Sequence, residues 1–181
     1  MYKLAISTSG EYVSAAIFEE KLLASFVSKT NKGSTGILLN QINELFDKTK
    51  ASRNDLNALY LDVGPGYYTG LRIGLSVSQG LGAVLGIPII PVNGLDALAF
   101  AAHTSHRKIC SLIDIKRNEF AYCEYMPVPG GVTRESDPQV ISVENLEIKL
   151  SDDADKKLLV GNWDLICLLY TSDAADEWWG G

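Results

Sequence analysis

A glycine-rich turn at residues 64–70 constrains the fold most, because it follows an apolar run and leads into a helical segment. Gly64 and Gly66 can adopt backbone angles that are closed to other residues, and Pro65 fixes its own φ angle. Thr69 is a suitable N-cap for the helix that follows. The segment is therefore predicted to be a tight connection between a buried strand and a helix.

The same turn could hold an anion. Backbone N–H groups at the positive end of a helix, with Arg72 in the first turn, suit a phosphate or a carboxylate. The spacing G-x-G-x-x-x-G differs from the dinucleotide-binding pattern, and no Lys-Ser/Thr pair follows to make a Walker loop. A purely structural turn without a ligand remains an open alternative. The candidate ligand residues are Gly64, Pro65, Gly66, Tyr67, Tyr68, Thr69, Gly70 and Arg72.

Small residues recur at every fourth position of the helix predicted over 69–86, namely Gly70, Gly74, Ser78, Gly82 and Gly86. These positions form one slowly drifting stripe on the helix surface. Each interior glycine costs about 1 kcal/mol relative to alanine, so the stripe indicates close backbone approach. Two interpretations stay open: packing on the protein's own sheet or a neighbouring helix, and docking against a helix of another subunit. Arg72 and Gln79 argue against a membrane dimerisation face.

The pattern over the first hundred residues predicts the order βββαβαβα. Three strands form an antiparallel meander, and helices and strands then alternate, which favours a mixed sheet flanked by helices. The expected strands are 2–9, 12–18, 22–28, 58–63 and 87–92, and the expected helices are 37–50, 69–86 and 94–102, the last capped by Asn93.

A second, smaller unit is expected after residue 104. Its predicted elements are strands 108–115 and 119–125 joined by a turn at 116–118, strand 139–142, a helix at 143–150 capped by Ser142, and strand 158–161. The tail 165–181 shows no sustained periodicity, and we interpret it as a non-native replacement of the true C-terminus. The predicted domains are 1–104, a partial second lobe at 105–164, and this tail.

Charge and cysteine content narrow the function class. The 181 residues carry a net charge of −6, which argues against a stand-alone nucleic-acid binder. Cys110, Cys123 and Cys167 lack the spacing of metal ligands, and reduced thiols are expected. No signal peptide or spanning helix is predicted, so a cytoplasmic location without membrane contact is expected.

Catalytic groups are sparse. His103 and His106 lie three residues apart near a predicted helix end, without an evident third ligand, so no metal is predicted. No nucleophile–base pair or metal triad supports a peptidase.

The sequence GPGYYTGLRIGLSVSQGLG at residues 64–82 closely resembles the signature of the TsaB (YeaZ) family, bacterial proteins that support threonylcarbamoylation of adenosine in tRNA. The usual family form begins Gly-Pro-Gly-Ser-Phe-Thr-Gly-Leu-Arg-Ile-Gly, and only Tyr67 and Tyr68 depart from it. Residues 113–122 resemble the second family block, Ile-Asp-Ala-Arg-x-Gly-Glu-Val-Tyr, with Asn118 in place of the glycine.

The resemblance implies an α/β fold of the actin/Hsp70 group, with a ribonuclease H-like first lobe and an incomplete second lobe. It also implies a subunit that is not catalytic by itself. Such a subunit would bind a TsaD-type catalytic protein and, with a TsaE-type ATPase, support transfer of threonylcarbamoyl to tRNA adenosine without binding tRNA strongly itself. A homodimer through the same surface stays open. The expected interface residues are Leu38, Gln41, Leu45, Gly70, Gly74, Ser78 and Gly82.

The alternative is an ATP-binding enzyme of the actin/sugar-kinase group, which would use ATP or ADP with Mg²⁺. Ser7 and Thr8 end the first predicted strand, where relatives in this group that handle phosphate keep an acid. Because Ser7 replaces that acid, a metal–nucleotide complex would lose one anchor. Asp114 is the candidate for a second acid.

Overall fold

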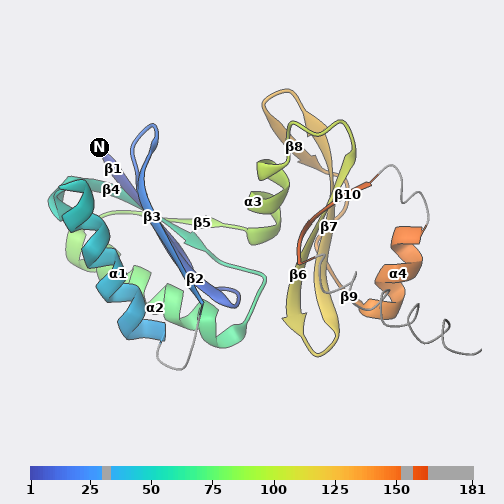
Figure 1. Cartoon of the computed structure of the whole chain (residues 1–181), viewed down its shortest axis with the longest axis horizontal. Helices are drawn as coiled ribbons and strands as arrows, with labels where there is room; N and C mark the ends of the chain where they lie inside the picture. Colours follow the sequence, from blue (N-terminus) through green and yellow to red (C-terminus); the bar gives the residue numbers. More distant parts are fainter. Residues whose placement is uncertain (30–33, 152–156, 163–181) are drawn as a thin grey trace, which may run out of the picture. The chain divides into compact units, whose positions relative to one another are not determined.

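The computed structural model describes residues 1–29, 34–151 and 157–162. It divides the chain into two units, Met1–Gly94 and Leu95–Gly181 (Figure 1). The boundary lies before helix α3 (Gly94–Ala101) rather than near residue 104, because Leu95 and Ala99 of that helix are buried in the second unit's core. The predicted tail lies outside the described residues.

The first unit contains the elements that the sequence predicts, with small shifts of their ends. Its strands are β1 (Tyr2–Ser7), β2 (Tyr12–Phe18), β3 (Leu22–Lys29), β4 (Leu56–Asp62) and β5 (Ile89–Val92), and its helices are α1 (Ser34–Thr49), the short 3-10 helix η1 (Arg53–Asp55) and α2 (Tyr68–Leu85).

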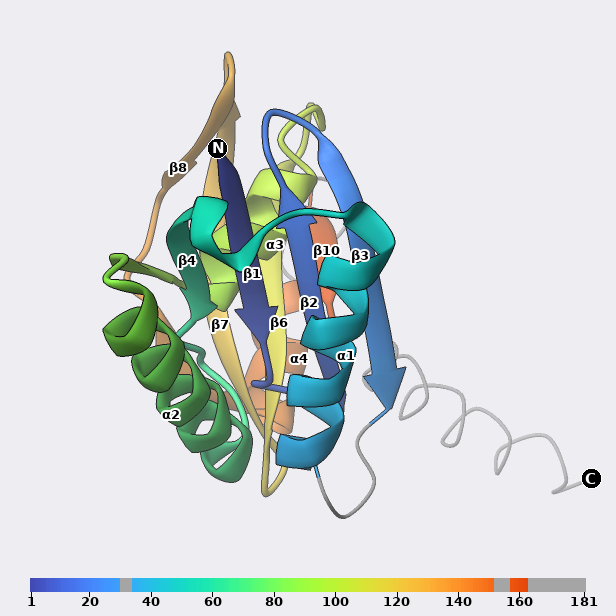
Figure 2. The same cartoon turned by 90° about the vertical axis from the view of Figure 1, so that its left-hand side faces the viewer.

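The first sheet has the strand order β3-β2-β1-β4-β5. The meander β1–β2–β3 is antiparallel, and β4 and β5 continue parallel to β1. Helices α1 and α2 lie on the same side of this sheet (Figures 1 and 2). The predicted mixed sheet is therefore confirmed, and no helix formed by residues 1–29 or 34–93 lies on its opposite face.

The core of the first unit lies between the sheet and the two helices. Strand residues alternate, so that Leu4, Ile6 and Ile17 are buried under the helices while their neighbours face the other side. Leu38 and Leu45 of α1 are 0% and 1% exposed in the same core. Their prediction as interface residues is therefore wrong: the apolar stripe of α1 holds the helix on its own sheet.

The second unit contains α3, β6 (Lys108–Lys116), β7 (Glu119–Val128), β8 (Gly131–Arg134), β9 (Gln139–Ser142), α4 (Val143–Ser151) and β10 (Lys157–Gly161). Its strand order is β10-β6-β7-β8, with β9 also paired to β7. β8 was not expected from the sequence. β6 and β7 are antiparallel, and β10 follows a helix and lies parallel to β6. This order resembles the start of the first unit, where β4 follows α1 and lies parallel to β1.

Helices cover both faces of the second sheet. α3 packs on one face with Ile109, Cys123 and Tyr125, and Leu146 of α4 packs on the other with Cys110 and further residues. Figure 1 shows the two helices on opposite sides of the β6–β7 hairpin. Cys110 and Cys123 therefore point to opposite faces, and both are free thiols with 0% exposure.

Candidate functional site

The glycine turn packs directly against the turn between β1 and β2. A Cβ atom added to Gly66 would lie 2.2 Å from the carbonyl oxygen of Ser9, and one added to Gly70 would lie 1.9 Å from that of Thr8. Real Cβ atoms do not approach an oxygen so closely, so both positions require glycine. The two turns touch at backbone distance.

Hydrogen bonds lock this contact. The backbone N–H of Tyr67 donates to the Ser9 carbonyl at 2.6 Å, and the Thr8 hydroxyl donates to the Gly70 carbonyl at 2.7 Å. Thr8 is only 2% exposed, so its hydroxyl has little access to water. The contact is a structural clamp between the β1–β2 turn and the start of α2.

Asp62, at the end of β4, completes the clamp. Its Oδ2 atom accepts hydrogen bonds from the hydroxyls of Ser7 at 2.7 Å and Ser9 at 2.5 Å, and its Oδ1 atom accepts one from the Gly64 backbone N–H at 2.8 Å. Sequence reasoning missed this residue. The available signal was an acid directly before the glycine turn, at the end of a strand neighbouring the one that ends in Ser7.

The clamp limits the turn as a phosphate site. The backbone N–H groups of Gly64 and Tyr67, which an anion would need, already donate to Asp62 and Ser9. A hollow of about 240 Å³ remains beside the clamp, below the range of about 300–1,000 Å³ that is usual for ligand pockets. The hollow is lined by Thr8, Gly10, Val13, Tyr67, Thr69, Gly70 and Ile73. Gly64 and Tyr67 therefore have no free backbone N–H group to offer a phosphate.

The start of α2 differs from the prediction. The helix begins at Tyr68, with Tyr67 as the N-cap residue and no side-chain cap, so the assignment of Thr69 as N-cap is wrong. Because the helix starts early, Thr69 lies inside the first turn and is exposed. Tyr68 is 73% exposed, and the Arg72 guanidinium lies 5.5 Å from the centre of its ring.

The glycine stripe faces inward. Gly74, Ser78 and Gly82 are buried, and Cβ atoms added to the two glycines would lie 2.4 Å from the Thr8 hydroxyl oxygen and 3.1 Å from Ile89. The prediction of Gly70, Gly74, Ser78 and Gly82 as interface residues is therefore wrong. Of the two interpretations, packing on the protein's own sheet is confirmed.

The outer side of α2 is open. Thr69, Arg72, Ile73, Ser76 and Val77 line a surface hollow of about 300 Å³, and a Cβ atom added to Gly80 would meet nothing within 4 Å. We call these residues, with Gly80, the outer groove. Exposed apolar side chains on the two helices are Leu75 at 44% and Val84 at 85% on α2 and Leu39 at 41% on α1. Gln41 of α1 is half-buried, and its amide donates to Glu44 at 3.3 Å.

Asp114 belongs to the second unit and shapes the β6–β7 turn. Its Oδ1 atom accepts a hydrogen bond from the Lys116 backbone N–H at 2.7 Å, and its Oδ2 atom lies 3.0 Å from the Lys116 ammonium. The turn residues Lys116, Arg117 and Asn118 all have positive φ angles. The predicted turn at 116–118 is confirmed, and the carboxylate of Asp114 is engaged in that turn.

Two polar clusters of the second unit link its elements. Asp96 of α3 accepts hydrogen bonds from Arg134 Nε at 2.7 Å and Nη2 at 2.5 Å and from the Tyr125 hydroxyl at 2.8 Å. The hydrogen bonds from Arg134, against the opposing effect of burial, lower the pKa of Asp96 below its usual value. This cluster fastens the first turn of α3 to β7 and β8.

The second cluster surrounds Glu124 on β7. Burial alone would raise the pKa of Glu124, but the hydrogen bond from Tyr122 and the nearby ammonium of Lys108 lower it. Lys108 lies 3.5 Å from Glu124 and 2.7 Å from Glu135. Burial raises the pKa of the neighbouring Cys110 thiol, which disfavours its reactive thiolate form.

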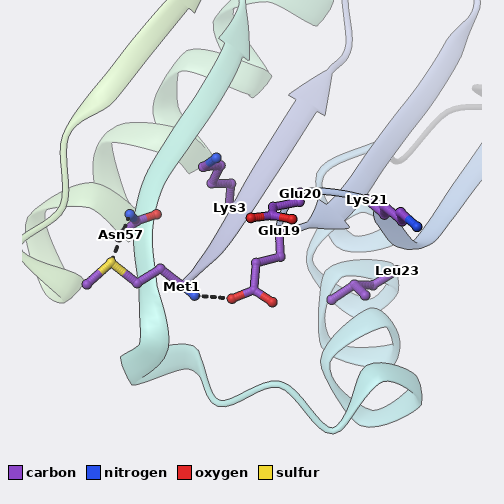
Figure 3. Close-up of a pocket in the computed structure, with 7 residues that line it drawn as sticks. All are labelled: Met1, Lys3, Glu19, Glu20, Lys21, Leu23 and Asn57. Atoms are coloured by element: carbon purple, nitrogen blue, oxygen red, sulfur yellow. Dashed lines mark hydrogen bonds and ion pairs between the residues drawn. The ribbon is translucent and has the colours of Figure 1, made fainter.

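A larger hollow, of about 610 Å³, lies at the start of β1 (Figure 3). The amino group of Met1 forms an ion pair with Glu19, and the Asn57 amide donates to the Met1 sulfur at 3.4 Å. Figure 3 shows Lys3, Glu20, Lys21 and Leu23 around them. These are charged surface residues without a buried acid–base pair, and the hollow offers no catalytic arrangement.

Residues 1–29, 34–151 and 157–162 contain no group of three or more His, Cys, Asp and Glu side chains placed to hold a metal ion. His103 is engaged with the Phe100 carbonyl at 2.8 Å and stacks on the Phe100 ring. No helix among them combines the length and the apolar character that crossing a bilayer requires.

The first sheet, with its order β3-β2-β1-β4-β5 and both helices on one face, defines an α/β protein of the actin/Hsp70 group, with a ribonuclease H-like first lobe. Residues 27–159 match the family model described as "TsaD: tRNA N6-adenosine threonylcarbamoyltransferase". The solved structure of YeaZ from Pseudomonas aeruginosa superposes with a TM-score of 0.71 and 27% identity, over 79% of this chain and 68% of that one.

Curated relatives identify the family within this class. The tRNA threonylcarbamoyladenosine biosynthesis protein TsaB of Buchnera aphidicola subsp. Schizaphis graminum is 30% identical over 162 residues, which are 88% of this chain and 77% of the relative. TsaB of Escherichia coli is 26% identical over 140 residues, 76% of this chain and 61% of the relative. The chain belongs to the TsaB (YeaZ) family, and the expected resemblance is confirmed.

Proposed function

We propose that the chain is a non-catalytic subunit in the synthesis of N6-threonylcarbamoyladenosine in tRNA, and that it binds a TsaD-type catalytic subunit through the outer groove of α2. Membership in the TsaB family supports the pathway. The proposal includes a TsaE-type ATPase as a further partner and a cytoplasmic location, where such a complex would meet tRNA.

The observation that carries the proposal is the outer groove itself. Ser76 and Gly80 are small and exposed, so the backbone of a second helix can approach α2 closely at this side. Val84, one turn after Gly80 on the same side of the helix, adds apolar surface that a partner would remove from water. Arg72 and Thr69 at one end supply polar contacts that would fix the direction of the partner helix.

The net charge of −6 agrees with this role. An acidic subunit gains little from direct contact with the phosphate backbone, so the catalytic partner would supply the contacts to tRNA. The same groove could also accept a second copy of this chain, and the partner titration described next separates the two occupants.

The test places a large side chain in the groove. Gly80→Leu should weaken binding to the TsaD-type subunit by about tenfold or more, because the leucine occupies the space of the partner helix. Leucine is the better helix former at this exposed position, so the variant should melt no lower than the parent chain. Binding is measured by calorimetric titration, and sedimentation of the chain alone reports self-association.

The matched control is Asn145→Leu, an exposed position of α4 in the second unit. It adds the same side chain elsewhere and should leave the affinity unchanged. If Gly80→Leu binds the partner as tightly as the control, the outer groove is not the interface and the proposal fails.

A further inference from the structure

The sequence contains a single Asn-Gly pair, Asn93-Gly94. The pair lies where strand β5 leads into helix α3, and Gly94 is both the first residue of that helix and the last residue of the first unit. Both residues are half-buried, so water reaches them in part. The chain therefore passes from the first unit to the second directly through this pair.

An Asn-Gly pair can modify itself, because glycine has no side chain to keep its backbone nitrogen away from the preceding asparagine. The nitrogen of Gly94, once it has lost its proton, attacks Cγ of Asn93. A bond forms between these two atoms, the bond from Cγ to the side-chain nitrogen breaks, and that nitrogen takes up a proton and leaves as ammonia. Water then opens the resulting cyclic imide at either carbonyl carbon, which gives aspartate or isoaspartate and adds one negative charge.

The structure holds the attacking nitrogen in a hydrogen bond. The backbone N–H of Gly94 donates to the Gly64 carbonyl at 2.8 Å. Gly64 is itself fixed, because its own N–H donates to Asp62 Oδ1 at 2.8 Å and a Cβ atom added to it would lie only 3.1 Å from the Leu71 side chain of α2. The proton of Gly94 is therefore available only when the contact with the glycine turn opens.

We infer that Asn93 is a site of spontaneous deamidation, and that opening of the hydrogen bond between Gly94 and Gly64 sets its rate. The clamp of the first unit thus controls a chemical change at the point where the chain leaves that unit. The inference does not depend on the proposed function, and no partner takes part in the reaction.

The two products differ in what they do to α3. Aspartate at position 93 keeps the main chain and places a carboxylate at the positive end of the helix, which is favourable. Isoaspartate routes the main chain through the side chain, and the added methylene moves the Gly94 N–H away from its place opposite the Gly64 carbonyl. Hydrogen exchange of the α3 amides should therefore be faster in the isoaspartate form than in Asn93→Asp, and equal exchange would contradict this consequence.

The first measurement compares Asn93 in the native and the unfolded state of the same full-length chain. Peptide mass spectrometry after incubation at neutral pH follows the conversion, and enzymatic methylation of the isoaspartyl carboxyl group identifies that product. Conversion should be at least about tenfold slower in the native chain than in urea, because a closed hydrogen bond withholds the attacking nitrogen. Equal rates in the two states, or no conversion in urea, would overturn the inference.

Asp62→Asn tests the control by the glycine turn. The variant weakens the hold on the Gly64 N–H without touching Asn93, and it should raise the native rate of conversion by about tenfold. Asn118 serves as an internal reference in the same molecule, because it is exposed and its following residue is a glutamate. Its conversion should not respond to Asp62→Asn. An unchanged rate at Asn93 would refute control by the glycine turn.

Leu38→Ala separates opening of the turn from unfolding of the whole unit. Leu38 is fully buried in the core of the same unit, so its truncation should destabilise the chain at least as much as Asp62→Asn. The conversion rate of Asn93 in Leu38→Ala should nevertheless stay within about twofold of the parent rate, because the Gly64 contact remains intact in the native state. If Leu38→Ala accelerates the conversion as much as Asp62→Asn does, global unfolding sets the rate and the inference fails.

Discussion

The two units attach a helix to their sheets in different ways. In the first unit, the start of α2 is held against the β1–β2 turn at backbone distance, through Gly70 and the preceding Gly66. In the second unit, the first turn of α3 is held by side chains, because Asp96 binds both Arg134 and Tyr125. The glycine contact of the first unit tolerates no added atom and does not itself involve a charged group. The Asp96 contact of the second unit tolerates substitution better, but it responds to pH and salt.

The largest expected effect tests the backbone contact. Gly70→Ala should lower the free energy of unfolding by about 3 kcal/mol, because the methyl group would overlap the Thr8 carbonyl oxygen. Gly80→Ala makes the same change on the same helix where the space is open. It should raise the free energy of unfolding by up to about 1 kcal/mol.

Urea denaturation followed by circular dichroism measures both changes. Effects of the same sign would show that glycine content, rather than contact with the β1–β2 turn, decides the stability of α2. The comparison between the two units would then lose its basis.

The second effect tests the carboxylate in the clamp of the first unit. Asp62→Asn keeps the shape of the side chain but removes the charge that accepts hydrogen bonds from Ser7, Ser9 and the Gly64 backbone. The free energy of unfolding should fall by about 2 kcal/mol. Asp55→Asn, at an exposed position of η1, is the control and should change it by less than about 0.5 kcal/mol. Equal effects of the two variants would mean that the clamp is held by glycine packing alone.

The smallest effect tests the side-chain clamp of the second unit. The pKa of Asp96 is lower in the folded chain than its ordinary value of 3.8, so folding is stabilised while Asp96 is ionised. This contribution is complete at pH values above 3.8 and is lost as the pH falls through the lower folded pKa. Because Asp96 is 41% exposed, Asp96→Asn should cost only about 0.5–1 kcal/mol at neutral pH.

The dependence on pH and salt shows whether the effect of Asp96→Asn comes from charge. The difference between the parent chain and Asp96→Asn should shrink as the pH falls below 3.8, and it should also shrink in about 1 M salt. The deficit of Gly70→Ala should not respond to salt. A salt-independent Asp96→Asn effect would indicate that packing, rather than charge, fastens α3.

Sequence alone predicted the elements of the first unit because its periodicities are strong and its turns contain glycine, proline or charged residues. It could not predict which side of α2 is buried. Ser76 and Gly80 on the outer side are as small as Gly74 and Ser78 on the inner side, and spacing by itself does not say which side meets the sheet. That choice depends on contacts with the β1–β2 turn, which is distant in the sequence.

The candidate site was predicted only in part, because its contacts also join residues that are distant in the sequence. Residues 64–70, Ser7 and Thr8 do come together, and hydrogen bonds among them and Asp62 form the clamp. Ser7 was identified as the replacement for an acid, and the acid it hydrogen-bonds, Asp62, lies 55 positions away along the chain. Leu38 and Leu45 illustrate a simpler limit, because an apolar stripe has the same pattern whether it faces a core or a partner.

The placement of Cys110 and Cys123 has a practical consequence. One thiol is sealed beneath α4 and the other beneath α3, so a thiol reagent can reach each only after the corresponding helix has lifted from the sheet. The rate at which each thiol is modified in the native chain thus measures how often the helix that covers it separates from the sheet. The modification rates of Cys110 and Cys123 therefore report separately on how often α4 and α3 separate from the second sheet.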